Sequence, residues 1–114
     1  MKGKEEKLNS SVLNIYPVLE EAELDELLLK EIEKNDVKFV VLDDDPTGVQ
    51  TVHDISVYTD WTVESMKKGL ADSNKVFYVL TNSRGMTEAE TTKIHREILQ
   101  AVSQAAKEED RRYL

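Results

Sequence analysis

The first half of the chain contains an amphipathic stretch that is followed by a short, mainly apolar run. Between Leu19 and Lys34, apolar residues recur at three- and four-residue spacing with acids and lysines between them, which predicts an amphipathic helix. These apolar positions are Leu24, Leu27, Leu28 and Ile32. The run VKFVVL, residues 37–42, is apolar apart from Lys38 and rich in β-branched residues, as in a strand that is covered on both faces of a parallel sheet.

The second half repeats this alternation. The segment ISVYTD predicts a second strand, and TVESMKKGL predicts a short helix that ends near Gly69. The segment KVFYVLTNSRG, residues 75–85, is again an apolar strand that breaks into small polar residues. Thr87 and Glu90 then have the spacing of a capping box, which predicts the start of a last helix. The apolar side of that helix carries Ile94, Ile98, Ala101 or Val102, and Ala105.

Helices that alternate with apolar strands predict a three-layer α/β/α fold with a mainly parallel sheet. Three strands make a thin sheet, and Tyr113 and Leu114 look like the start of another strand, so we expect an incomplete domain from a longer protein. Residues 1–18 contain Pro17 and no clear period, which predicts an irregular N-terminal arm. We expect residues 19–114 to form the N-terminal part of the α/β domain.

Composition and charge narrow the classes of molecule that the protein is expected to bind. With 114 residues and a formal net charge of -8, the chain has no basic stripe that would neutralise phosphates, so we expect no nucleic-acid partner. It lacks cysteine, and it shows neither a signal-peptide pattern nor an apolar stretch of membrane-spanning length. We therefore expect a cytoplasmic protein that does not bind membranes.

Two polar clusters, DDDPTG and TNSR, directly follow predicted strands. Ligands of α/β folds collect beyond the carboxyl ends of parallel strands, so the clusters are expected to face one crevice. Because strand side chains alternate, Asp43 and Asp45 should project together while Asp44 points away. A turn that caps the next segment is one interpretation; a site for a hydroxylated substrate or for Mg²⁺, with Asp43 and Asp45 as candidate ligands, is the other.

The spacing of Asp43, Asp45 and Thr47 as D-x-D-x-T after an apolar strand resembles the first motif of the haloacid dehalogenase-like phosphatases. That resemblance implies that Asp43 is a phosphoryl-accepting nucleophile, that Asp45 is its acid and base, and that Mg²⁺ assists. Thr81 would then contact phosphate, and the rest of the family's motifs would lie beyond Leu114.

A longer resemblance competes with this one. The segments LDDDPTGVQTVHDISVYTDW and FYVLTNSRGMTEAE resemble the N-terminal, substrate-binding domain of the four-carbon acid sugar kinases, which act on threonate, erythronate and their oxo relatives. Val49, Gly85 and Met86 depart from that family's usual residues. The resemblance implies that this domain grips the sugar acid, whereas ATP and Mg²⁺ belong to a separate domain. The chain alone is then expected to bind no cofactor and to be inactive as a kinase.

The kinase resemblance also assigns roles to residues. It makes Asp45 or Asp44 the candidate catalytic base, and it implies a small-molecule sugar acid as the partner. Arg84 can bind a substrate carboxylate bidentately, although it is also a natural structural ion-pair partner for the aspartates. The substrate-binding candidates are Asp43, Asp44, Asp45, Thr47, Gly48, Gln50, Asn82, Ser83 and Arg84.

A third hypothesis is a small, acidic α/β module that binds a metabolite or a partner without catalysis. An incomplete domain exposes the apolar edge that missing strands would cover, so it would tend to form homodimers.

Overall fold

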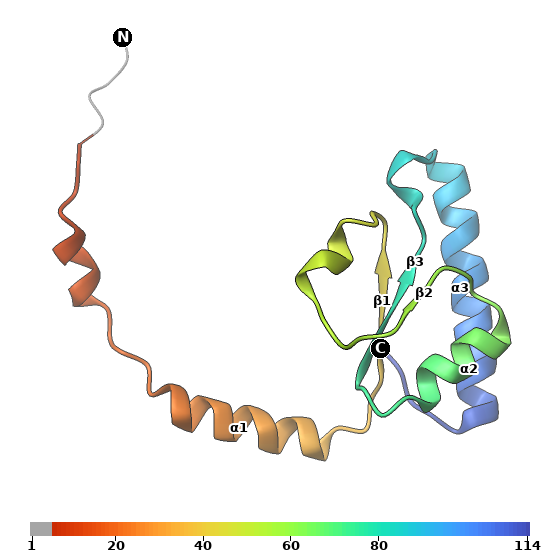
Figure 1. Cartoon of the computed structure of the whole chain (residues 1–114), viewed down its shortest axis with the longest axis horizontal. Coiled ribbons are helices and arrows are strands. Elements are labelled where there is room, and N and C mark those ends of the chain that lie inside the picture. The colour runs from red at the N-terminus through yellow and green to blue at the C-terminus, as the bar shows by residue number, and fades with distance from the viewer. Residues whose placement is uncertain (1–5) are drawn as a thin grey trace, which may run out of the picture. The chain divides into compact units, whose positions relative to one another are not determined.

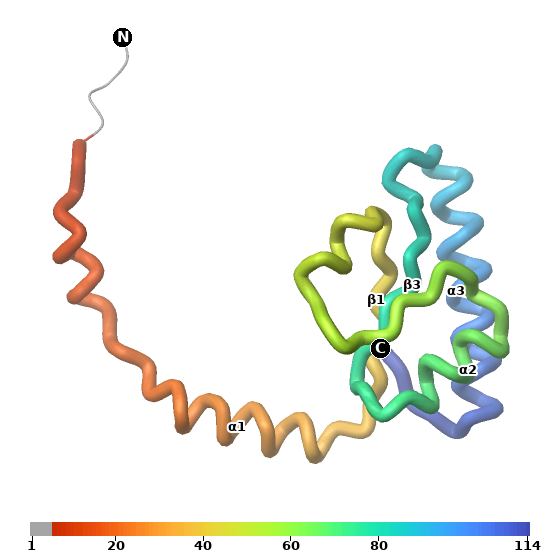
Figure 2. The backbone as a smooth tube through the Cα atoms, in the orientation of Figure 1, coloured from red at the N-terminus to blue at the C-terminus, as the bar shows by residue number. Residues whose placement is uncertain are grey.

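The computed structural model describes residues 6–114, and the chain divides into two compact units, Met1–Asn35 and Asp36–Leu114. The course of the backbone is shown as a ribbon in Figure 1 and as a tube in Figure 2. Within the described residues, no helix combines the length and the apolar character that a membrane span requires.

In the first unit, the described residues 6–35 contain two helices. The 3-10 helix η1 (Ser10–Ile15) is capped by Asn9, whose side chain accepts a hydrogen bond from the Ser11 N–H. The described part of the arm that we expected to be irregular therefore contains a short helix, because a side-chain cap satisfies its first turn. Helix α1 (Glu21–Lys34) confirms the predicted amphipathic helix. None of its side chains is buried, so exposed pairs such as Glu26 with Lys30 support it.

The second unit is built on a parallel sheet of three strands, β1 (Phe39–Asp43), β2 (Val57–Tyr58) and β3 (Val76–Leu80). The spatial order is β1-β3-β2, so β3 is central and pairs in parallel with both neighbours. The α/β class and the parallel sheet are thus confirmed. Strand β2 is shorter than the ISVYTD segment that predicted it, since only two of its residues pair with β3.

Helices α2 (Val63–Ala71) and α3 (Glu88–Glu109) pack on the sheet face that carries Phe77 and Val79. The unit therefore contains two of the three expected layers, one sheet and one layer of helices. The buried core consists of Met66, Leu70, Phe77, Val79, Ile98, Val102, Ala105 and Ala106.

The N-terminal ends of both helices are capped by side chains of the residues that precede them. The capping box of Thr87 and Glu90 is present at the start of α3, where the side chain of each residue accepts a hydrogen bond from the other's backbone N–H. Helix α2 has a similar N-terminal cap, in which the Thr62 hydroxyl accepts a hydrogen bond from the Ser65 N–H. These caps determine the residues at which the two helices begin.

The C-terminal residues pair with the free edge of β1. Tyr113 forms a parallel bridge with Lys38, and the Leu114 N–H donates to the Lys38 carbonyl at 2.8 Å. Tyr113 and Leu114 therefore add to the sheet, as predicted. The Lys38 side chain is only 1% exposed, and its Nζ donates to the carbonyls of Asp72 and Asn74 in the turn after α2. Lys38 thus ties that turn to the edge of the sheet.

Candidate functional site

The two polar clusters meet at one edge of the sheet, as the parallel register requires. Asp43 and Leu80 are the last paired residues of β1 and β3. Beyond them the Thr81 N–H donates to the Asp43 carbonyl at 2.8 Å, and the Arg84 N–H donates to the Asp44 carbonyl at 3.2 Å. Backbone hydrogen bonds therefore fix the segment after β3 against the segment after β1.

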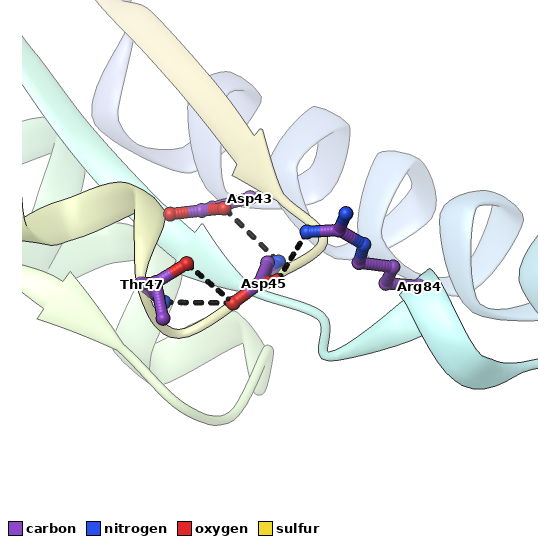
Figure 3. A network of polar contacts seen from close by, with 4 residues as sticks. All are labelled: Asp43, Asp45, Thr47 and Arg84. Carbon is purple, nitrogen blue, oxygen red and sulfur yellow. Dashed lines mark hydrogen bonds and ion pairs between the residues drawn. The ribbon is translucent and has the colours of Figure 1, made fainter.

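The carboxylate of Asp45 is the centre of this arrangement (Figure 3). Its Oδ1 accepts hydrogen bonds from the Thr47 N–H at 2.9 Å and from the Thr47 hydroxyl at 2.8 Å. Its Oδ2 accepts a hydrogen bond from Arg84 Nη1 at 2.5 Å, which is also an ion pair. The Thr47 N–H, the Thr47 hydroxyl and Arg84 together lower the pKa of Asp45 to about 2, because each stabilises the charged form.

The capping turn and the ion pair predicted from the sequence are therefore both present around Asp45. Its side chain is 22% exposed, whereas that of Arg84 is 72% exposed. Asp45 thus holds one end of an otherwise accessible guanidinium. The pair links β1 to β3 through side chains, in addition to the backbone bonds.

Asp43 and Asp44 lie in different surroundings, in agreement with the alternation expected at the end of a strand. Asp43 Oδ1 accepts a hydrogen bond from the Asp45 N–H at 3.1 Å. Asp43 Oδ2 is buried and has no hydrogen-bond partner among the residues described. It lies against Gly48, where an added Cβ would be only 2.5 Å away. Asp44, in contrast, is exposed.

Three of the four carboxylate oxygens of Asp43 and Asp45 accept hydrogen bonds within the protein. Within residues 6–114, no group of three or more His, Cys, Asp or Glu side chains could hold a metal ion. Both Asp45 oxygens are engaged by Thr47 and Arg84, and the unpartnered Asp43 oxygen is covered beside Gly48. The same burial disfavours Asp43 as a phosphatase nucleophile, because a nucleophile must be reached by its substrate.

The remaining candidates divide into exposed and buried groups. Asn82 is exposed and has a left-handed backbone with φ of 53°, which turns the chain after β3. Gln50 is exposed in the 3-10 helix η2 (Gly48–Thr51). Ser83 is only 6% exposed, and its hydroxyl lies 2.8 Å from that of Thr81.

The contacts of two buried groups near the sheet were not predicted from the sequence. The Thr81–Ser83 hydroxyl pair is one, and the buried Lys38 is the other. An apolar run that ends in Thr and Ser signals the first position, but only the packing shows that the hydroxyls bind each other. Lys38 lies within the run VKFVVL, which signals a covered position, but only the packing shows that its Nζ binds the carbonyls of Asp72 and Asn74.

Comparison with known proteins assigns the chain to a family. A family described as a sugar-binding N-terminal domain matches residues 39–114, which include both polar clusters. Since this match covers most of the chain, the protein belongs to that family. No curated protein and no solved structure matches the chain.

Proposed function

We propose that this chain binds a four-carbon sugar acid at the edge formed by the ends of β1 and β3, as the substrate-binding part of an ATP-dependent kinase. Membership of a sugar-binding family supports the class of ligand. The observation that carries the assignment to this edge is the Asp45–Arg84 pair, which holds an exposed cation beside exposed acceptors.

Arg84 suits the carboxylate of a sugar acid. A guanidinium has five N–H donors in a planar fork, and the pair with Asp45 engages only Nη1. The other donors remain for a ligand carboxylate, which can bind bidentately. Because Asp45 already restrains the side chain, ligand binding costs less conformational entropy than it would for an unrestrained arginine.

The aspartates suit the hydroxyls of the ligand. The exposed Asp44 carboxylate and the exposed Asn82 amide can accept or donate hydrogen bonds at the same edge. The proton of the reacting hydroxyl would pass to Asp44 or Asp45. While Thr47 and Arg84 hold the pKa of Asp45 near 2, that carboxylate is a weak base, so it would have to lose hydrogen bonds before it could act as the general base.

The phosphoryl group would come from ATP with Mg²⁺, bound by the separate domain that the kinase resemblance implies. The residues of the present chain would bind and orient the sugar acid. We therefore expect the 114-residue chain to bind the acid without turning it over, and a longer protein with that domain to form ADP only when the sugar acid is present.

Calorimetric titration of the chain with sodium L-threonate and sodium D-erythronate tests the binding step. Arg84→Ala should weaken binding at least about 10-fold, because it removes charge-assisted hydrogen bonds to the carboxylate. Arg112→Ala is the matched control, since Arg112 is a similarly exposed arginine that pairs with Asp36. Equal affinity in the two variants, or no binding of either acid by the unmodified chain, would refute this assignment.

A further inference from the structure

Thr81 and Ser83 form a buried hydroxyl pair in the segment that leads from β3 to Arg84. Thr81 is 3% exposed and Ser83 is 6% exposed. Thr81 Oγ1 donates to the Asp43 carbonyl at 3.1 Å, and it lies 2.8 Å from Ser83 Oγ. The Ser83 N–H donates to the same Thr81 oxygen at 3.3 Å.

These contacts use the full capacity of the Thr81 hydroxyl. A hydroxyl has one proton to donate and two lone pairs that accept. Since the proton of Thr81 goes to the Asp43 carbonyl, the Ser83 hydroxyl must donate to Thr81 in the bond between them. The Ser83 proton is therefore directed into the protein and away from a ligand.

The pair also determines the course of the chain between β3 and Arg84. Asn82 adopts the left-handed conformation, which costs free energy in a residue other than glycine. The bonds between Thr81 and Ser83 span this turn across Asn82, and the bond from Thr81 to the Asp43 carbonyl ties the start of the turn to β1. They bring the Arg84 N–H within 3.2 Å of the Asp44 carbonyl.

We propose that Thr81 and Ser83 are positioning residues that hold Arg84 against the aspartate cluster, which consists of Asp43, Asp44 and Asp45. We also propose that Ser83 makes no contact with the sugar acid. This inference rests on the proposed function for its meaning in binding. Its structural half, the positioning of Arg84, can be tested without any ligand.

The test compares Thr81→Val, which keeps the branched shape but removes the hydroxyl, with Thr81→Ser, which restores it. Amide hydrogen exchange measured by NMR reports the Arg84 N–H, with the Ile98 N–H in α3 as an internal reference. In Thr81→Val, exchange at Arg84 should rise about 10-fold relative to Ile98, as expected when one local hydrogen bond is lost. Thr81→Ser should return it to the original value.

The control for general destabilisation is Ser103→Ala. It removes another partly buried hydroxyl bond, that of Ser103 with Tyr113 at 2.6 Å, and Tyr113 pairs with Lys38 at the end of β1 opposite to the candidate site. This variant should leave the ratio of exchange at Arg84 and Ile98 unchanged. If Thr81→Val does not fold, Ser83→Ala gives the same comparison, because it removes the donor to Thr81.

Binding of sodium L-threonate by the same variants completes the test. We expect Thr81→Val to weaken binding about 10-fold and Thr81→Ser to restore it. Unchanged exchange at Arg84 in Thr81→Val, or failure of Thr81→Ser to restore it, would overturn the inference. If exchange follows the prediction but the unmodified chain binds no sugar acid, the positioning role holds and the proposed function fails.

Discussion

Replacement of Gly48 by alanine should disrupt the aspartate cluster directly. An added Cβ at this position would lie 2.5 Å from Asp43 Oδ2 and 2.7 Å from Asp43 Oδ1. Ordinary van der Waals contact begins at 3.4 Å, so the carboxylate would have to move by about 0.9 Å. Such a movement would break the bond from the Asp45 N–H, because Asp43 Oδ1 accepts it at 3.1 Å.

The expected cost follows from this geometry. Overpacking of a filled site costs about 1–3 kcal/mol, and loss of a hydrogen bond lies within the same range. Gly48→Ala should therefore lower the free energy of unfolding by about 1–3 kcal/mol. Urea unfolding followed by Trp61 fluorescence measures this value, since Trp61 is the only tryptophan and packs against the core.

Gly85→Ala provides the matched control. No atom lies within 4 Å of an added Cβ at Gly85, so its unfolding midpoint should change little. A double variant, Asp43→Ala with Gly48→Ala, should show a much smaller effect of the Gly48 change than the single variant does, because the clashing carboxylate is gone. Equal midpoints for Gly48→Ala and Gly85→Ala would refute the reasoning.

Two further predictions concern the pKa of Asp45 and the burial of the Lys38 side chain. The pKa of Asp45, read from the pH dependence of its carboxyl ¹³C shift, should be about 2, and Thr47→Val should raise it towards 3.8. Since the folded pKa is the lower one, the stability that Asp45 contributes is present above about pH 4 and is lost as the pH falls towards 2. Lys38→Met should destabilise the fold by about 1–3 kcal/mol in urea, because the carbonyls of Asp72 and Asn74 lose their buried donor.

Both predictions have internal controls. The carboxyl of Asp60, whose pKa is also lowered by local hydrogen bonds, should keep its titration in Thr47→Val. Lys30→Met removes an exposed lysine of α1 that pairs with the exposed Glu26, and it should change the unfolding midpoint by little. An unaltered Asp45 titration in Thr47→Val would contradict the hydrogen-bond account, and equal stability of the two lysine variants would contradict the burial argument.

The sequence predicts the regular elements well where local signals and burial agree. The apolar runs became β1 and β3, and the Thr87–Glu90 spacing marks the start of α3 correctly. Because parallel strands must end at one edge, the same reasoning places Asp45 beside Arg84. Local pattern and topology are sufficient for these features.

The details of the site depend on packing that no local pattern encodes. The burial of Asp43 Oδ2 beside Gly48 results from how the turn after β1 folds back. The inward direction of Ser83 follows from its bond to Thr81. Sequence reasoning grouped Ser83 with the exposed Asn82, since both are small polar residues after a strand.

The most direct test of the central claim is an NMR titration of the ¹⁵N-labelled chain with sodium L-threonate. If the sugar acid binds where we propose, amide shifts should change in residues 44–48 and 82–84, which come from the two strand ends. The amides of α2 and of α1 should stay constant. Changes confined to other parts of the chain, or no saturable change at all, would contradict a sugar-acid site at this edge of the sheet.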